Sequence, residues 1–178
     1  SGPQEREETI FGCKPFLDIT RRLTEAGFAV FRYDDRGVGK STGIFMASHV
    51  QDFVRDAEAV VKAMKEHKAV NPQRIFLLGH SEGSYIASKV ASQDRSLAGI
   101  VSLAGPVFGM DRILADQMDA LSLLGGKSDE ERATLRKGNL EVYGLMQDKR
   151  LSLDEVKAKA SKVVERLLPV MTSDTTMY

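Results

Sequence analysis

The pentapeptide Gly79-His80-Ser81-Glu82-Gly83 constrains the fold of this chain more than any other stretch. It follows the apolar run 74–78 and precedes the helix-like segment 84–93, so a strand is expected to pass directly into a helix at this point. GxSxG in that setting forms a very sharp turn, the nucleophile elbow, in which small residues avoid clashes and the serine hydroxyl stands above a sheet. Ser81 is therefore the first candidate for chemistry.

Composition excludes several classes of protein. The 178 residues suit one domain, or a domain core with an appendage. Lys plus Arg and Asp plus Glu are 25 each, so no net field favours nucleic acid or an anionic membrane, and neither is an expected partner. Cys13 is the single cysteine, which excludes an internal disulfide framework and a CxxC site, and we expect it to be a small packed residue. No apolar run approaches the roughly 20 residues that span a bilayer.

Hydrophobic periodicity predicts an α/β fold with a parallel sheet. Apolar runs separated by amphipathic helices are typical of βαβ units, whose strands are covered on both faces. The expected elements, in chain order, are a helix over 14–26, a strand over 28–33, a polar loop over 34–41, a helix over 50–67, a strand over 74–78, a helix over 84–93 and a strand over 97–104.

The carboxyl-terminal part of the sequence predicts helices only. Ser128 with Glu131, and Ser152 with Glu155, have the spacing of capping boxes that begin helices. Three consecutive helices after a sheet are typical of a cap or lid. We therefore divide the chain into a partial core over 1–109, a helical cap over 110–170 and a linker over 171–178 that returns to further core strands.

A serine needs help to become a nucleophile. A base must take its proton, an acid must orient that base, and N–H donors must stabilise the oxyanion. The elbow provides one donor, the backbone N–H of Glu82, and Ser1-Gly2-Pro3 is the candidate loop for the second. Pro3 has no N–H, so the donor is expected from Ser1 or Gly2.

Several ordered motifs resemble the bacterial α/β-hydrolases of the esterase and serine-aminopeptidase-like group. They are Ser-Gly-Pro-Gln at the amino end, Tyr-Asp-Asp-Arg-Gly-Val-Gly-Lys-Ser over 33–41, the elbow, and Leu-Ala-Gly-Pro over 103–106. The resemblance implies Ser81 as the catalytic nucleophile, an oxyanion hole from the backbone N–H groups of Glu82 and of Ser1 or Gly2, and a bracing role for the 34–41 loop. It also implies that the substrate is a small-molecule carboxylic ester, with an amide or a thioester as the less favoured alternative, and that no metal or organic cofactor is needed.

The chain departs from the group in two respects. In this fold the acid and the histidine follow the serine, but His49, His67 and His80 all precede Ser81, and Asp111 is better explained as a first-turn helix residue. The central strand that precedes Ser-Gly-Pro in the group is absent as well. We therefore expect the 178 residues to be the middle of a larger enzyme. The alternatives are that a neighbouring copy completes the sheet by strand exchange or that the sheet is rearranged. We expect the chain alone to be a weak catalyst.

Two other classes of function were weighed. Residues 37–42 imitate the end of a P-loop, but that motif needs glycine at position 34, where this chain has Asp34. A non-catalytic binding module on a hydrolase scaffold is the other alternative, favoured by the missing base and acid.

Overall fold

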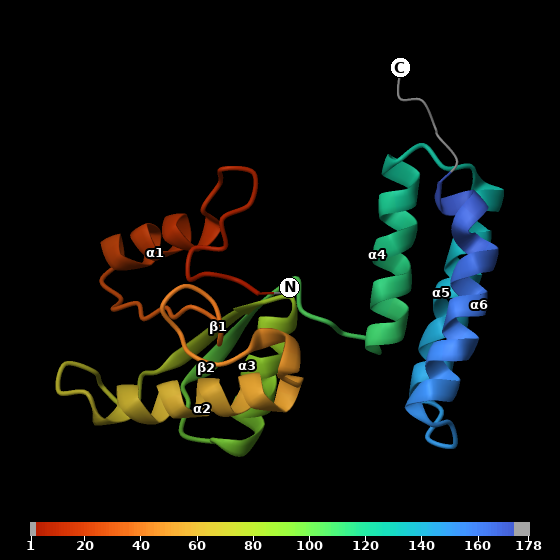
Figure 1. Ribbon diagram of the computed structural model, residues 1–178. Helices are drawn as coiled ribbons and strands as arrows, with labels where there is room; N and C mark the ends of the chain where they lie inside the picture. The colour runs from red at the N-terminus through yellow and green to blue at the C-terminus, as the bar shows by residue number, and fades with distance from the viewer. Residues whose placement is uncertain (1–2, 173–178) are drawn as a thin grey trace. The chain divides into compact units, whose positions relative to one another are not determined.

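The computed structural model describes residues 3–172, apart from the side chain of Met110, and divides into two compact units, Ser1–Pro106 and Val107–Tyr178 (Figure 1). The division predicted from the sequence falls three residues later, after residue 109. The function of the second unit as a cap stays a prediction.

The first unit contains a two-stranded parallel sheet with helices around it. Its elements are α1 (Pro15–Glu25), the short 3₁₀ helix η1 (Phe45–Ala47), α2 (Val50–Glu66), β1 (Phe76–His80), α3 (Glu82–Gln93) and β2 (Gly99–Leu103). Phe76 pairs with Gly99 and His80 with Leu103, so both strands end at the same edge of the sheet. The helix α3 forms the crossover between them. This is the predicted α/β fold in incomplete form.

The core of the first unit lies where α2 and α3 pack together. Its buried members are small or β-branched: Val54, Ala57, Val61 and Val90, with the partly buried Leu77, Ile86 and Leu97 against them. In α2 these residues recur at helical spacing, which is why one face of that helix is covered. Figure 1 shows α1 on the other side of the strands from α2.

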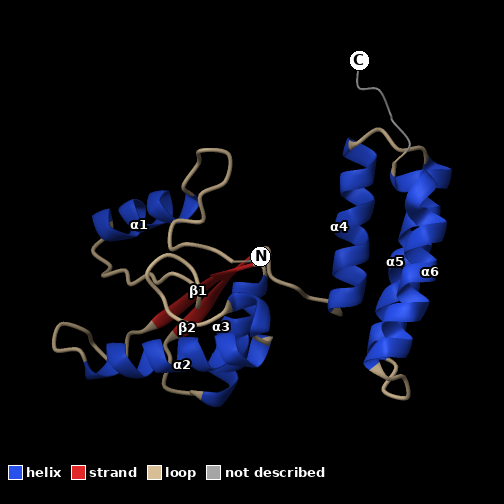
Figure 2. Cartoon of the chain, in the orientation of Figure 1, coloured by secondary structure: helices blue, strands red, loops and turns tan. Residues whose placement is uncertain are grey.

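The predicted strand over 28–33 is wrong for the described structure. These residues run as extended chain without strand pairing, within the loop that joins α1 to α2 (Figure 2). Phe28 is 50% exposed and Phe31 is 55% exposed. Local pattern marks a segment that suits a strand, but a strand forms only with a hydrogen-bonding neighbour, and none of the described residues provides one here. The strand predicted over 74–78 likewise begins and ends two residues later, at Phe76 and His80.

The environment of Cys13 was also wrongly predicted. Ile10 and Cys13 exchange backbone hydrogen bonds of 3.0 and 2.9 Å across a tight turn before α1. Cys13 lies exposed in that turn rather than packed in a core.

The second unit consists of α4 (Met110–Leu124), α5 (Asp129–Gln147) and α6 (Leu153–Met171). Both predicted capping boxes are present: the backbone N–H of Glu131 donates to the Ser128 hydroxyl, and that of Glu155 to the Ser152 hydroxyl, at 3.3 Å in each case. Asp111 lies in the first turn of α4, as expected.

Contacts between neighbouring helices stabilise this unit. Arg132 of α5 pairs with Asp119 of α4 at 2.7 Å, and Gly138 of α5 lies close against Leu167 of α6.

The predicted linker over 171–178 begins in the last residue of α6, and residues 173–178 lie outside the described part of the chain. Within residues 3–172, no helix is both long and apolar enough to cross a membrane.

Candidate active site

Ser81 lies at the junction of β1 and α3, where the sequence predicted the elbow. Its backbone has φ of +51° and ψ of −117°, a conformation that residues other than glycine rarely adopt. The Ser81 N–H donates to the Leu103 carbonyl at 2.8 Å, which ties the turn to the end of β2. Strained backbone at a strand-to-helix junction, held by the neighbouring strand, is the geometry that presents a nucleophilic serine.

The turn depends on the absence of a side chain at Gly79. A Cβ added there would lie 2.6 Å from the Ser84 backbone nitrogen and closer still to the Gly83 carbonyl group. The buried Ser84 hydroxyl fills the remaining space and donates to the Gly79 carbonyl at 2.6 Å. The first glycine of the motif is therefore required by contact between β1 and the start of α3. Gly83 differs, because an added Cβ there meets no atom within 4 Å.

One of the three predicted oxyanion donors can be examined directly. Glu82 is the first residue of α3, so its N–H has no acceptor in a preceding helical turn and lies at the positive end of the helix dipole. Ser1 and Gly2 lie outside the described residues, and their predicted roles stay predictions. The chain that follows them is tied to the 34–41 loop, since Gln4 N–H donates to the Asp35 carboxylate at 3.1 Å and Asp35 N–H to the Gln4 carbonyl at 3.0 Å.

The 34–41 loop is organised around the carboxylate of Asp34, which is only 5% exposed. It accepts hydrogen bonds from the Arg6 guanidinium at 2.9 and 2.7 Å, the Arg6 N–H at 3.0 Å and the Lys40 N–H at 3.2 Å. The Arg6 side chain is the main reason that the pKa of Asp34 lies well below its ordinary value. This carboxylate takes the Lys40 N–H and places a negative charge inside the loop, where a P-loop would hold phosphate, which argues against nucleotide binding.

The next carboxylate, Asp35, has the opposite electrostatic character. Burial raises its pKa, the nearby negative charges of Glu82 and Asp56 act in the same direction, and the Gln4 N–H opposes them. Arg36 meanwhile pairs with Asp56 through two hydrogen bonds of 2.7 and 2.6 Å. The loop therefore holds residues 4–6 and α2 through contacts too long-range to be read from the sequence, and its role in bracing the site stays a prediction.

The three histidines occupy separate places. His80 lies at the end of β1, where its Nδ1 is 3.2 Å from the Glu8 carboxylate and its ring meets Phe16 edge-on at 6.5 Å between centroids. These contacts place the His80 ring against Glu8 and Phe16, beside the elbow. His49 and His67 flank α2. Glu8 is the residue that sequence reasoning missed, because nothing in the acidic run 5–8 distinguishes it from Glu7.

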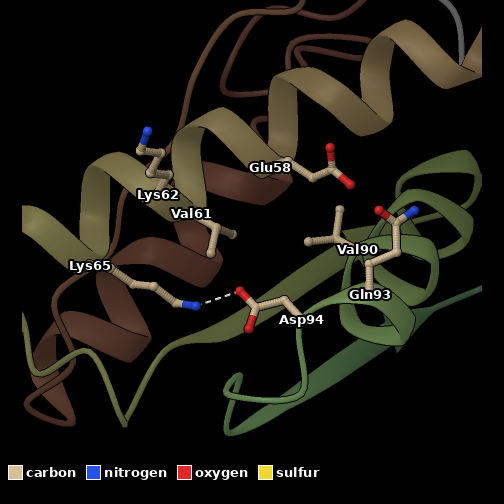
Figure 3. Close-up of a pocket in the computed structure, with 7 residues that line it drawn as sticks. All are labelled: Glu58, Val61, Lys62, Lys65, Val90, Gln93 and Asp94. Atoms are coloured by element: carbon tan, nitrogen blue, oxygen red, sulfur yellow. Dashed lines mark hydrogen bonds and ion pairs between the residues drawn. The ribbon is translucent and has the colours of Figure 1, made fainter.

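Two hollows open on the first unit. The smaller, about 120 Å³, adjoins His80 and is lined mainly by apolar groups: Glu8, Ile10, Pro15, Phe16, Ile19, His80 and Leu103. The larger, about 320 Å³, lies between α2 and α3 and contains no residue of the elbow (Figure 3). Two of its charged groups, Lys65 and Asp94, form the ion pair drawn there. Among the described residues, no three His, Cys, Asp or Glu side chains are grouped so as to hold a metal ion.

An α/β core with a serine at a strained strand-to-helix turn defines the α/β-hydrolase class. Residues 12–150 match the family described as serine aminopeptidase, S33, and the chain belongs to that family of hydrolases. It is 32% identical to the esterase EstD of Thermotoga maritima over 74% of this chain and 31% of the relative. It is 26% identical to a monoglyceride lipase homolog of monkeypox virus over 89% of this chain and 62% of the relative. The chain thus spans about a third and about three fifths of these two proteins.

Proposed function

We propose that this chain carries the nucleophile of a serine hydrolase that cleaves carboxylic esters through an acyl-enzyme on Ser81. The observation that carries the proposal is the backbone of Ser81, held at φ +51° between β1 and α3. The names of two relatives, an esterase and a monoglyceride lipase homolog, support an ester over an amide or thioester. No metal or organic cofactor is invoked.

The proposed reaction has two halves. In the first, Ser81 Oγ forms a bond to the ester carbonyl carbon, its proton is transferred to the departing alkoxide through a base, and an alcohol leaves. The negative oxygen formed on the way is stabilised by the Glu82 N–H and, as a further proposal, by an N–H of Ser1 or Gly2. In the second half, water attacks the acyl group, the carboxylic acid is released and the Ser81 hydroxyl is restored.

The base is the part of the machinery that the described residues do not assign. His67 accepts the Ala69 N–H at its Nδ1 at 3.2 Å, and His80 Nδ1 faces Glu8. Enzymes of this kind retain some rate enhancement without their base, about 10³–10⁴-fold over water, from the oxyanion hole and binding. We therefore expect Ser81 to react slowly but selectively in this chain.

Covalent labelling tests the proposal. A fluorophosphonate forms an O–P bond with an activated serine and loses fluoride, and peptide mass spectrometry locates the adduct. We expect one adduct, on the peptide containing Ser81, which is absent in Ser81→Ala. Ser92→Ala is the matched control, because Ser92 lies on the same helix and its hydroxyl donates to the Lys89 carbonyl at 2.7 Å, away from the elbow.

The alternative function is a binding module on a hydrolase scaffold, in which no base activates Ser81. That alternative predicts no adduct on Ser81 at any probe concentration. Labelling that persists in Ser81→Ala would likewise remove Ser81 from the role of nucleophile.

A further inference from the structure

Glu8 is a buried carboxylate that the proposed reaction does not use. It is 6% exposed, and its backbone φ of +49° lies in the region that residues other than glycine rarely occupy. A buried charge without a partner is strongly unfavourable, so this carboxylate needs a specific contact. The Glu8 carboxylate contacts the Nδ1 of His80, at 3.2 Å.

The turn that presents Glu8 is built by Glu5. The Glu5 carboxylate accepts the N–H groups of Glu7 and Thr9, both at 3.0 Å, and its carbonyl accepts the Glu8 N–H at 2.9 Å. Glu7 leaves the turn in another direction, toward Lys14, with which it pairs at 2.5 Å. The two neighbouring glutamates therefore make different contacts, and of the two only Glu8 contacts the elbow, at His80.

His80 connects this turn to the nucleophile. It precedes Ser81 directly, it pairs with Leu103 in the sheet, and Leu103 accepts the Ser81 N–H at 2.8 Å. The His80 ring is held from two sides, by Glu8 at Nδ1 and by the edge-on ring of Phe16. The contacts of this ring are therefore made one residue before the backbone that sets the Ser81 conformation.

We propose that Glu8 is a positioning residue that acts through His80, tying the amino-terminal segment 3–8 to the residue before Ser81 and so fixing the geometry of the elbow. The inference rests on the proposed function of Ser81. Backbone strain such as that of Glu8 persists only where the surrounding structure maintains it, which is typical of residues that serve a site.

Labelling kinetics test the proposal. In Glu8→Ala, the maximal rate of fluorophosphonate labelling at Ser81 should fall about 10- to 100-fold, the factor for losing a hydrogen bond to a charged group. Glu8→Gln, which keeps an acceptor for His80, should restore most of that rate. Glu7→Ala is the matched control and should label like the unmodified chain, since it removes the same charge one residue away.

The amplitude of labelling separates positioning from a purely structural role. Positioning predicts a slower maximal rate with the full fraction of chains labelled and unchanged probe affinity. A reduced labelled fraction at an unchanged rate would overturn the proposal, because that result means only that fewer chains are folded.

A measurement without activity keeps this inference distinct from the proposed function. In ¹H–¹⁵N spectra, the backbone amide signals of His80, Ser81 and Glu82 should shift in Glu8→Ala and hold their positions in Glu7→Ala. If the unmodified chain is not labelled, the proposed function fails while these spectra still decide whether Glu8 positions the elbow. Unchanged signals at Ser81 in Glu8→Ala would refute it.

Discussion

The two outer glycines of the GxSxG motif should respond oppositely to the same substitution. At Gly79 an alanine Cβ would lie 2.6 Å from the Ser84 nitrogen and closer to the Gly83 carbonyl, so backbone atoms would have to move. At Gly83 nothing lies within 4 Å, and the residue is in the first turn of α3 with ordinary helical requirements. The motif is symmetric in sequence but not in space.

The magnitudes follow from these contacts. Overpacking costs about 1–3 kcal/mol. Shifting α3 also weakens the bonds from Ser84 Oγ to Gly79 and from Ser81 N to Leu103, which contribute about 1 kcal/mol each. Gly79→Ala should therefore lower the free energy of unfolding by about 3–5 kcal/mol. Gly83→Ala should leave it unchanged or raise it by up to about 1 kcal/mol, the helix preference of alanine over glycine.

Urea unfolding followed by circular dichroism measures both changes in the same buffer. The comparison between the two variants is the decisive quantity, since it cancels errors common to both extrapolations. The steric reasoning would be refuted if Gly79→Ala unfolded within about 0.5 kcal/mol of the unmodified chain, the usual range for a surface substitution. Equal damage from Gly83→Ala would refute it too.

Three further predictions rest on separate parts of the chain. Asp34 has a lowered pKa in the folded protein, so its pairing with Arg6 stabilises the fold above the ordinary carboxyl pKa, and this stabilisation is lost as the pH falls below that value. In thermal unfolding, Asp34→Asn should therefore cost stability at pH 7 and progressively less toward pH 3, and a constant difference would contradict this. Ser128→Ala and Ser152→Ala should each destabilise their helices by about 1 kcal/mol through loss of the N-cap, measured by unfolding against the double variant, whose effect should be additive. The 178-residue chain should hydrolyse p-nitrophenyl acetate or butyrate weakly at most, and robust turnover abolished by Ser81→Ala would show that a base is present after all.

Local signals predicted much of the structure. The apolar stripe of α2, the capping boxes at Ser128 and Ser152, and the strand-to-helix setting of Ser81 each depend on residues within about one or two turns of one another. Such patterns can be recognised in the sequence because they depend on neighbouring residues and not on distant partners.

The failures arise where the folded environment of a segment differs from what its composition suggests. The segment 28–33 has the composition of a strand, but strand formation requires a neighbour that the described residues do not supply. Cys13 resembles a small core residue, but the hydrogen bonds across the turn at Ile10 leave it in solvent. In both cases the composition indicated a structural preference, pairing in a sheet for 28–33 and burial for Cys13, and the surrounding structure did not allow it.

The sequence by itself determined the class of fold, the identity of the candidate nucleophile and the order of the helices. Only the tertiary structure decided which carboxylates are buried and which groups they pair with. Glu8 meets His80 across 72 positions of sequence and Arg6 meets Asp34 across 28. Along the chain Glu7 and Glu8 are equivalent, and the difference between them arises from a backbone turn that buries one carboxylate and leaves the other partly exposed with Lys14. Burial and charge pairing are properties of the folded environment, which neighbouring residues in the sequence do not encode.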